Sequence, residues 1–392
     1  MPFALYLLAL AVFVMGTSEF MLAGLLPAIA ADLGISLGTA GMLTSAYAVG
    51  MALGAPLMAA FARRWPPRPT LVLCLLAFAA SHAIAALAPA FPVLLLTRVL
   101  SALANAGFLA VALGAATTLA PANQKGRALS ILLSGTTIAT VAGVPAGALL
   151  GTASGWRSTF WAIAILCIPA VCGVIGGIAK DSGQGAASVS PPRLGAELSQ
   201  LAAPRLFLAM ALGALVNAGT FAAFTFLAPL VTGTAGLAEG WVPLALVMFG
   251  IGSFLGVTAA GRLSDQRPGL VLAAGAPLLL AGWIALAWAA SHPIALIALL
   301  LVQGFLSFGV GSTLITLVLY AASGAPTMGG SYATAALNIG AAAGPLLGAF
   351  GLATGLGLLA PVWVAAALTA IALAIMLLAW RTLAKTALDA SR

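Results

Sequence analysis

Charged side chains are scarce in this sequence. Only 6% of its 392 residues are Asp, Glu, Lys or Arg, whereas roughly a quarter are charged in an ordinary soluble domain. At the same time 63% of the residues are apolar, which is more than the core of one domain can remove from water. The composition therefore excludes a water-soluble globule and predicts a protein whose main solvent is lipid.

Cysteine and histidine are also rare, with three and two residues respectively. Cys74, Cys167 and Cys172 lie in apolar runs without a partner His or a second CxxC pair, which disfavours a disulfide framework and a zinc site. We expect neither a metal nor a cofactor. HExxH, an intramembrane His pair and GxSxG with a suitable base are all missing, so an enzyme is disfavoured. Without a GxxxxGK[ST] motif, ATP is not the direct energy source.

The net charge of +8 does not indicate a nucleic-acid partner. A nucleic-acid footprint is a basic stripe on one folded face, whereas the 15 Lys and Arg residues are scattered between apolar runs. Their positions indicate membrane topology instead. If the N-terminus is cytoplasmic, all of them but Arg98 and Arg157 fall in inner loops or the C-terminal tail. Both termini are therefore predicted to be cytoplasmic.

Twelve apolar runs occupy nearly the whole chain, and each is long enough to cross a bilayer as a helix. Backbone groups in lipid must be satisfied within the segment, so helices are expected. The first run follows no Lys or Arg and contains Glu19, so we expect a retained span and not a cleaved signal peptide. The runs are residues 3–30, 38–62, 69–89, 92–120, 126–153, 156–179, 205–232, 240–262, 269–290, 294–320, 327–352 and 357–380.

A hydrophilic stretch rich in Ser, Gly and Pro divides the spans into two sets of six. We predict an N-terminal six-helix bundle at 1–179, a cytoplasmic linker at 180–204, and a C-terminal bundle with a short cytoplasmic tail at 205–392. A shift of 202 positions places Gly50 on Gly252 and Gly54 on Gly256. The segment GVPAGALLG at 143–151 is similar to GAAAGPLLG at 340–348. Repeated halves are typical of secondary transporters.

The whole chain resembles the major facilitator superfamily, and within it the twelve-span drug/proton antiporters. The loop GRLSDQRPG matches the superfamily's inner-loop signature through Gly261, Leu263 and Asp265, although the first half departs from it, with Ala59 and Arg63 at the glycine and aspartate positions. Arg98 matches the family's intramembrane arginine. The run VFVMGTSEFMLAGLLPAIAADLGIS is similar to bacterial chloramphenicol-resistance exporters. The resemblance implies an all-α integral membrane protein with two pseudo-symmetric six-helix bundles and alternating access.

Glu19 is the candidate proton carrier. It is the one carboxylate inside a predicted span, where a charge is costly and an acid is by default a functional candidate. Arg98 is the one cation away from the ends of a predicted span, and under the family fold it lies near Glu19. The two would then couple proton binding to transport. The alternatives are a permanently paired structural acid and an arginine that reaches the outer headgroups.

Conformational roles are expected for two further groups of residues. Gly143, Pro145, Gly147 and Gly151 match the family's antiporter signature; they remove a backbone donor and leave a smooth strip, which suits gating or close packing with a kink. Asp265 is expected to cap a helix or to pair with Arg262 or Arg267, closing the inner side, with a solvated loop carboxylate as the alternative. His82 and His292 are expected at the outer ends of their spans and receive no role.

The spans offer many rings and few polar groups, which suits a small amphipathic aromatic molecule better than a sugar or a phosphorylated metabolite. The sequence therefore predicts a monomeric proton-coupled exporter in the bacterial inner membrane, with chloramphenicol as the expected drug and a nucleoside or sugar as the alternative cargo. The candidate substrate-binding residues are Tyr47, Asn105, Asn217, Phe221, Phe224, Gln303 and Asn338, with Phe305 and Phe308 as further aromatic residues in the spans.

Overall fold

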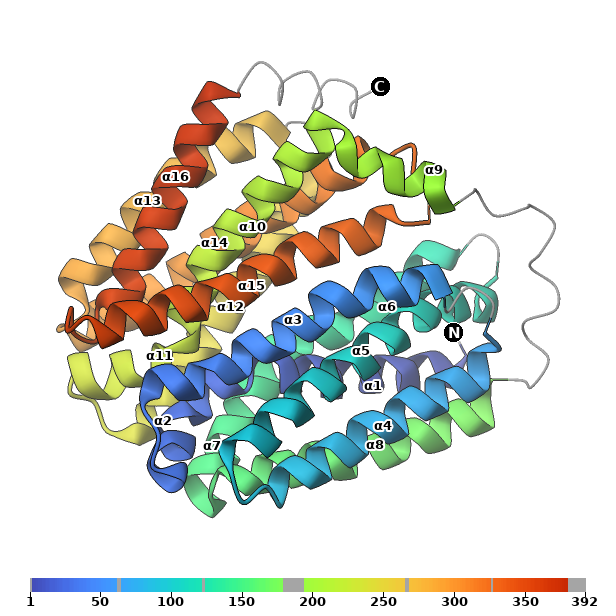
Figure 1. Cartoon of the computed structure of the whole chain (residues 1–392), viewed down its shortest axis with the longest axis horizontal. Helices are drawn as coiled ribbons and strands as arrows, with labels where there is room; N and C mark the ends of the chain where they lie inside the picture. Colours follow the sequence, from blue (N-terminus) through green and yellow to red (C-terminus); the bar gives the residue numbers. More distant parts are fainter. Residues whose placement is uncertain are drawn as a thin grey trace.

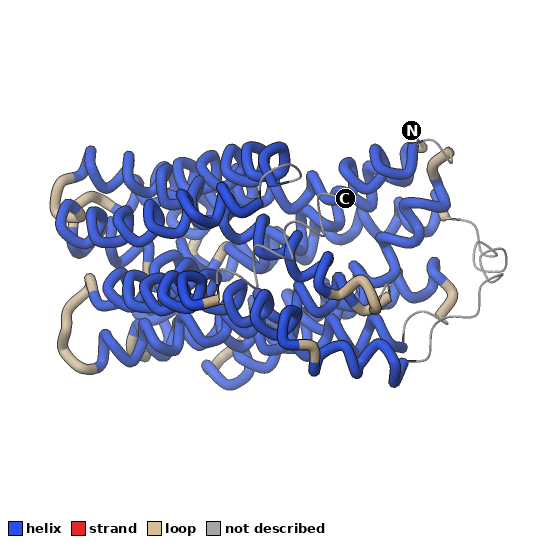
Figure 2. The backbone as a smooth tube through the Cα atoms, turned by 90° about the horizontal axis from the view of Figure 1, so that it is seen from above, coloured by secondary structure: helices blue, strands red, loops and turns tan. Residues whose placement is uncertain are grey.

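The computed structural model describes residues 2–61, 65–121, 124–178, 194–264, 268–325 and 327–379. Within these ranges the chain is helical and contains no β-strand. Twelve stretches are long and apolar enough to cross a membrane, which confirms the prediction of an all-α fold with twelve transmembrane helices. Figure 2 shows these helices running in the same general direction, with the connecting loops gathered at the two ends.

Eight helices form the first six spans. Proline begins several of them at a position where no intrahelical N–H bond is lost, as Pro67 does for α4. Gly34, with φ of 62°, ends α2 in the left-handed conformation that glycine adopts without strain. The helices are α1 (Phe3–Phe20), α2 (Leu22–Leu33), α3 (Leu37–Phe61), α4 (Pro67–Ala86), α5 (Phe91–Leu119), α6 (Lys125–Ile138), α7 (Val144–Ser154) and α8 (Trp156–Gly177).

The second six spans follow the same order. They are preceded by one short helix, α9 (Leu194–Ser199), which lies before the seventh span. The remaining helices are α10 (Pro204–Thr225), α11 (Leu227–Pro229), α12 (Val242–Ser264), α13 (Pro268–Ala289), α14 (Pro293–Ala321), α15 (Gly329–Ala353) and α16 (Ala360–Leu378).

Two predicted spans are interrupted in the structure, and only for the fifth did the sequence indicate a kink. The first is interrupted at Met21, between α1 and α2. The fifth contains a π-helical turn at Ala139–Gly143 between α6 and α7. Pro145 lacks the N–H that an α-helix would direct at Val141. It is the second residue after this turn, and the missing donor accounts for the local widening.

The helices form two groups, with α1 to α8 below and α10 to α16 above in Figure 1. In the first group α5 packs on α3 and α4, and α1 packs on α6 and α8. In the second group α14 packs on α12 and α13, and α15 and α16 pack on α10. Each group has its own large cluster of buried apolar side chains.

Two seams join the groups. Along the first, α3 lies beside α15, and the Ser45 hydroxyl donates a hydrogen bond of 2.8 Å to the Ala342 carbonyl. Along the second, α12 packs on the π turn and on α7. At the end of the molecule where α2 and α11 meet, the ring of Phe226 lies against Gly41 of α3 and Gly348 of α15.

Residues related by the 202-position internal repeat make equivalent helix–helix contacts in the two groups. A Cβ atom added at Gly50 would meet Val99, and one added at Gly252 would meet Leu301, which is the residue 202 positions further along. Gly54 and Gly256 likewise approach Leu103 and Phe305, again 202 positions apart. The α3–α5 pair of the first group is therefore packed as the α12–α14 pair of the second.

Part of the predicted linker is ordered helix. Residues 194–202, which the sequence analysis placed in the linker, form α9 and a following 3-10 turn. Glu197 on α9 is fully buried, and its carboxylate accepts hydrogen bonds from the Met328 amide, at 2.9 Å, and from the amide and hydroxyl of Thr327. The Tyr332 hydroxyl donates to the Glu197 carbonyl. These contacts fix α9 to the start of α15.

Candidate functional site

The last turn of α1 carries three consecutive side chains that face different parts of the molecule. Successive helical residues are about 100° apart, so neighbours in sequence contact different helices. Ser18 is buried and contacts α4 and α5. Glu19 is half-buried. Phe20 contacts Phe221 and Phe224 of α10, across the seam between the groups.

Arg98 is buried on α5 and is held by Ser18. Its Nη1 donates to the Ser18 hydroxyl and its Nη2 to the Ser18 carbonyl, both at 2.9 Å. The guanidinium lies 4.4 Å from the centre of the Tyr47 ring, in a cation–π arrangement. Only 1% of Arg98 is exposed, so it does not reach the headgroups as the alternative expectation required.

Glu19 and Arg98 come near each other without direct contact. The two side chains interact electrostatically. Among the residues that the structure describes, however, the ion pair within 4.0 Å is Arg157–Asp32 and not Glu19–Arg98. Arg98 therefore acts on Glu19 through space, and the carboxylate is not locked to the guanidinium.

Tyr47 links this charged group to α5. Asn105 donates its amide hydrogen to the Tyr47 hydroxyl at 2.9 Å, while the amide oxygen of Asn105 has no hydrogen-bond partner. Both side chains are buried. The sequence analysis placed Tyr47 and Asn105 in a substrate site, and the structure brings them together beside Arg98.

A pocket lined with aromatic rings lies between the two groups of helices. Neighbouring rings are in contact, with centroids 4.8 Å apart for Phe224 and Phe249 and 5.8 Å apart for Phe20 and Phe221. Little free space remains between the rings, so a drug-sized ligand requires the rings or the groups to move. The lining residues are Phe20, Thr140, Val144, Thr220, Phe221, Phe224, Leu246, Phe249 and Phe308.

Three predicted substrate residues lie elsewhere in the second group. Asn217 donates a hydrogen bond of 2.7 Å to the Leu337 carbonyl, and Asn338 donates one of 2.9 Å to Thr334 of its own helix. Gln303 is buried between α13 and α14 and approaches the Leu279 carbonyl at 3.4 Å. None of the three lines the aromatic pocket. Phe305 also lies outside it, in an apolar groove between α13 and α14.

The predicted glycine strip packs within the first group. Gly143 lies against Thr17 of α1, Gly147 lies against Thr159 of α8, and Gly151 lies against Leu25 of α2. The opposite face of the same span meets the second group, because a Cβ atom added at Gly250 of α12 would lie 2.5 Å from the Thr140 carbonyl oxygen. The expected surface between the halves is therefore formed by the π turn and Gly250.

The predicted inner-loop pair is described only in part. Arg262 is exposed in the last turn of α12, whereas Asp265 and Arg267 lie outside the described residues.

His82 lies near the end of α4, as expected, but its side chain is buried among the helices, which corrects the expectation that it has no role because it faces the interface. It is 1% exposed, and its Nε2 lies 2.6 Å from the Ser18 hydroxyl. Sequence reasoning also missed Phe20, Phe249 and the burial of Glu197. The internal repeat could have indicated Phe249 as a site residue, because Phe249 lies 202 positions after the candidate Tyr47.

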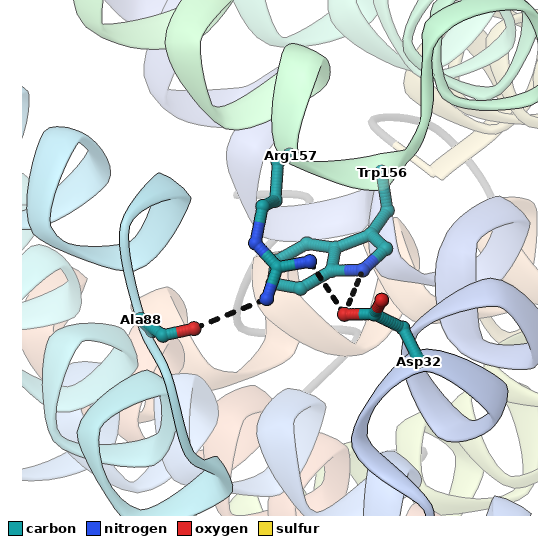
Figure 3. Close-up of polar contacts among 4 residues, drawn as sticks. All are labelled: Asp32, Ala88, Trp156 and Arg157. Carbon is teal, nitrogen blue, oxygen red and sulfur yellow. Dashed lines mark hydrogen bonds and ion pairs between the residues drawn. The ribbon is translucent and has the colours of Figure 1, made fainter.

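A second charged cluster lies at the end of the molecule where α2 meets α8 (Figure 3). Arg157 stacks on the Trp156 ring, at 4.2 Å from its centre, and donates a hydrogen bond of 2.5 Å to Asp32. It also donates to the Ala88 carbonyl, at 3.2 Å. The hydrogen bond from Arg157 holds the pKa of Asp32 below its ordinary value, against a smaller opposing effect of burial. The cluster ties three segments of the first group together.

Among the described residues, twelve apolar helices in two similarly packed groups, with an aromatic pocket between the groups, have the architecture of a multi-pass membrane transporter. Residues 8–336 match the Major Facilitator Superfamily. The chain belongs to this superfamily.

Known proteins resemble the chain along its whole length. It is 62% identical over 390 residues to the chloramphenicol resistance protein of Streptomyces lividans, covering 100% of this chain and 99% of that protein. It is 31% identical to the inner membrane transport protein YdhP of Escherichia coli K12, covering 91% and 90% of the two chains.

Among solved structures, a bacterial homologue of the human lysosomal transporter Spinster, in an inward-facing and occupied conformation, superimposes with a TM-score of 0.74. The two share 18% identity over 97% of each chain. At this identity the likeness shows the fold alone.

Proposed function

We propose that this protein is a proton-coupled efflux transporter of the bacterial inner membrane, which exports chloramphenicol or a similar small amphipathic aromatic drug. The bundles at 1–179 and 205–392 alternate between exposing the central site to the cytoplasm and to the outside. Both termini and the linker at 180–204 are cytoplasmic, and the protein acts as a monomer.

The substrate class is supported by the aromatic pocket and by the close relative. Rings from both groups of helices line the pocket, and its polar atoms are few. Such a lining suits an aromatic ring with a small number of polar substituents and gives a sugar too few hydrogen-bond partners. A relative that is 62% identical carries the name of a chloramphenicol resistance protein. Phe221 and Phe224 would hold the ring, and Tyr47 and Asn105 would contact polar groups of the drug.

One observation supports proton coupling: the candidate proton carrier and a residue that lines the pocket are consecutive on α1. Glu19 is half-buried, and the next residue, Phe20, lines the pocket. Movement of α1 that accommodates a drug against Phe20 therefore also moves Glu19. Arg98 lies close enough to influence the carboxylate without binding it. The acid releases its proton on one side and is free to take another on the other side.

The first test is a transport assay with the purified protein in proteoliposomes. An imposed pH gradient is expected to drive labelled chloramphenicol against its concentration gradient, and a protonophore is expected to abolish this. Glu19→Gln should stop gradient-driven transport while still binding drug, because the amide cannot exchange a proton. Glu239→Gln, at an exposed acid, is the matched control. Undiminished gradient-driven transport by Glu19→Gln would overturn the coupling role.

The second test is a resistance panel. Expression in a drug-sensitive bacterial host is expected to raise the inhibitory concentration of amphenicols, with no comparable protection against toxic nucleoside or sugar analogues. Protection against the analogues but not against amphenicols would replace the proposed cargo with a polar metabolite.

A further inference from the structure

His82 is a buried titratable group next to the proposed proton site. It lies on α4 between two rings, with centroid distances of 4.3 Å to Phe78 and 5.8 Å to Phe160. Both of its ring nitrogens have polar partners. Burial alone requires partners for both nitrogens, but one of these partners, the Ser18 hydroxyl, also accepts a hydrogen bond from Arg98 and so connects His82 to the charged group.

The two partners determine the tautomer of His82. Nδ1 lies 2.8 Å from the Phe78 carbonyl oxygen, which can only accept a hydrogen bond, so Nδ1 carries the hydrogen. In the neutral ring Nε2 is then an acceptor. The Ser18 hydroxyl, 2.6 Å away, must therefore donate its hydrogen to Nε2.

The direction of this bond orients Ser18 toward Arg98. Because the Ser18 hydrogen points at His82, the oxygen lone pairs are available to the Nη1 group of Arg98, at 2.9 Å. The Ser18 carbonyl accepts from Nη2. Both terminal nitrogens of the guanidinium are thus directed at the residue that precedes Glu19, and the carboxylate itself is left without the ion pair.

We propose that His82 is a positioning residue for proton exchange: by accepting the Ser18 hydrogen it holds Arg98 on Ser18 and keeps the guanidinium off the Glu19 carboxylate. The inference rests on the proposed proton coupling. Without the acceptor on α4, the Ser18 hydroxyl turns to another partner. Arg98 then loses one of its two bonds and is free to swing to Glu19.

The other groups around His82 are consistent with this role. α4 packs on α5 and α8. From α5 the charged group near His82 is Arg98, and α8 presents the ring of Phe160. Arg98 in turn lies near Glu19 of α1 and Tyr47 of α3. Among the described residues the cation that acts on His82 is Arg98. A chain of contacts therefore runs from the Phe78 carbonyl through His82 and Ser18 to Arg98, and its last member is the one that acts on Glu19.

The test is the pH dependence of drug/proton exchange. His82→Leu introduces an apolar side chain of similar bulk and removes the nitrogen that accepts the Ser18 hydrogen. It should move the pH at half-maximal exchange toward acid by about one unit, because an opposite charge next to a carboxylate favours its ionised form by that order. His82→Gln places an amide oxygen near the Nε2 position and should restore most of the wild-type profile.

Two further variants separate positioning from a general loss of structure. Ser18→Ala removes the intermediate link and should shift the profile in the same direction, while the double variant with His82→Leu should shift it no further than either single variant. His292→Leu changes the exposed histidine and should leave the profile unchanged. Chloramphenicol binding by each purified variant shows that the protein is folded.

The outcomes distinguish the inference from the proposed function. If wild-type proteoliposomes show no pH-driven exchange, the proposed function fails and the inference fails with it. If the wild type is coupled but His82→Leu and Ser18→Ala both keep its pH profile, only the positioning role of His82 is overturned. If His82→Leu does not fold, Ser18→Ala and His82→Gln decide: an unshifted Ser18→Ala profile overturns the inference, as does a His82→Gln profile that is shifted as far as that of Ser18→Ala.

Discussion

The contact between Gly250 and the π turn determines how closely the two groups of helices meet. A Cβ atom added at Gly250 would lie 2.5 Å from the Thr140 carbonyl oxygen and 3.0 Å from the Cα atom of Val141. Ordinary carbon–oxygen contacts begin at about 3.3 Å, so one backbone must move by roughly 0.8 Å. Both partners are helix backbone, and a change of side-chain rotamer cannot relieve the overlap.

We therefore expect Gly250→Ala to disfavour the closed seam by about 1–3 kcal/mol, the usual cost of overpacking. That energy corresponds to a shift of about 5- to 150-fold in the equilibrium between closed and open seams. Gly261→Ala is the matched control on the same helix, because an added Cβ atom there meets nothing within 4 Å. The control should leave the equilibrium unchanged.

Spin labels report the opening directly. Labels on cysteines introduced at Thr152 and Glu239, which are exposed where α7 approaches the turn before α12, give the width of the seam in lipid nanodiscs. Gly250→Ala should enlarge the long-distance population, and Gly261→Ala should not. An unchanged distance distribution in folded Gly250→Ala would refute the reasoning that this contact limits closure. The native thiols to be replaced first are Cys74, Cys167 and Cys172.

Two further predictions concern stability in detergent. Glu197→Ala removes the hydrogen-bond acceptor for Thr327 and Met328, and each hydrogen bond to a charged group contributes about 1.5–3 kcal/mol, so the variant should have a clearly lower Tm. Glu197→Gln should lower Tm less. Equal Tm values for all three proteins would contradict the docking of α9. Arg157→Ala should lower Tm slightly at pH 7. Because the pKa of Asp32 is lowered in the folded state, the Tm difference between the wild type and Arg157→Ala should persist above a pH of about 4 and shrink as the pH falls through the lowered pKa. A Tm difference that grows toward acid pH would contradict this reasoning.

The number and type of helices could be predicted because the lipid environment leaves few alternatives. Apolar runs of sufficient length must be helices, and twelve of them are found. The breaks within spans were harder to predict. Pro145 marked the fifth span as irregular, but the π turn lies before the proline, and nothing comparable in the sequence marks the break at Met21.

The site could be predicted only where a residue type is unusual for its surroundings. Glu19 and Arg98 stand out as charges in apolar runs, and the structure brings them near each other. His82 did not stand out, because its burial depends on packing against Ser18, Phe78 and Phe160, and the sequence alone does not indicate these contacts. The same holds for the amides: whether an Asn or Gln meets a ligand or a backbone carbonyl depends on which way its helix faces.

The two repeats use the same packing for different chemistry. The 202-residue shift that relates the α3–α5 and α12–α14 contacts places Phe249 at the position of Tyr47, and Leu300 at that of Arg98. At these two positions the first group buries Tyr47 and the charge of Arg98, and the second group has apolar side chains, of which Phe249 lines the pocket.

Such a division follows from the cost of burying charge, since a second arginine with no acid beside it would have no compensating partner in lipid. It also suits exchange of a proton for an apolar drug. The equivalent helices α3 and α12 each lie at one of the two seams between the groups. In the proposed mechanism a single movement of the groups would therefore expose or close the proton site and the ring site together. Phe20, the neighbour of the proposed proton carrier Glu19 on α1, lines the aromatic pocket and would link the two.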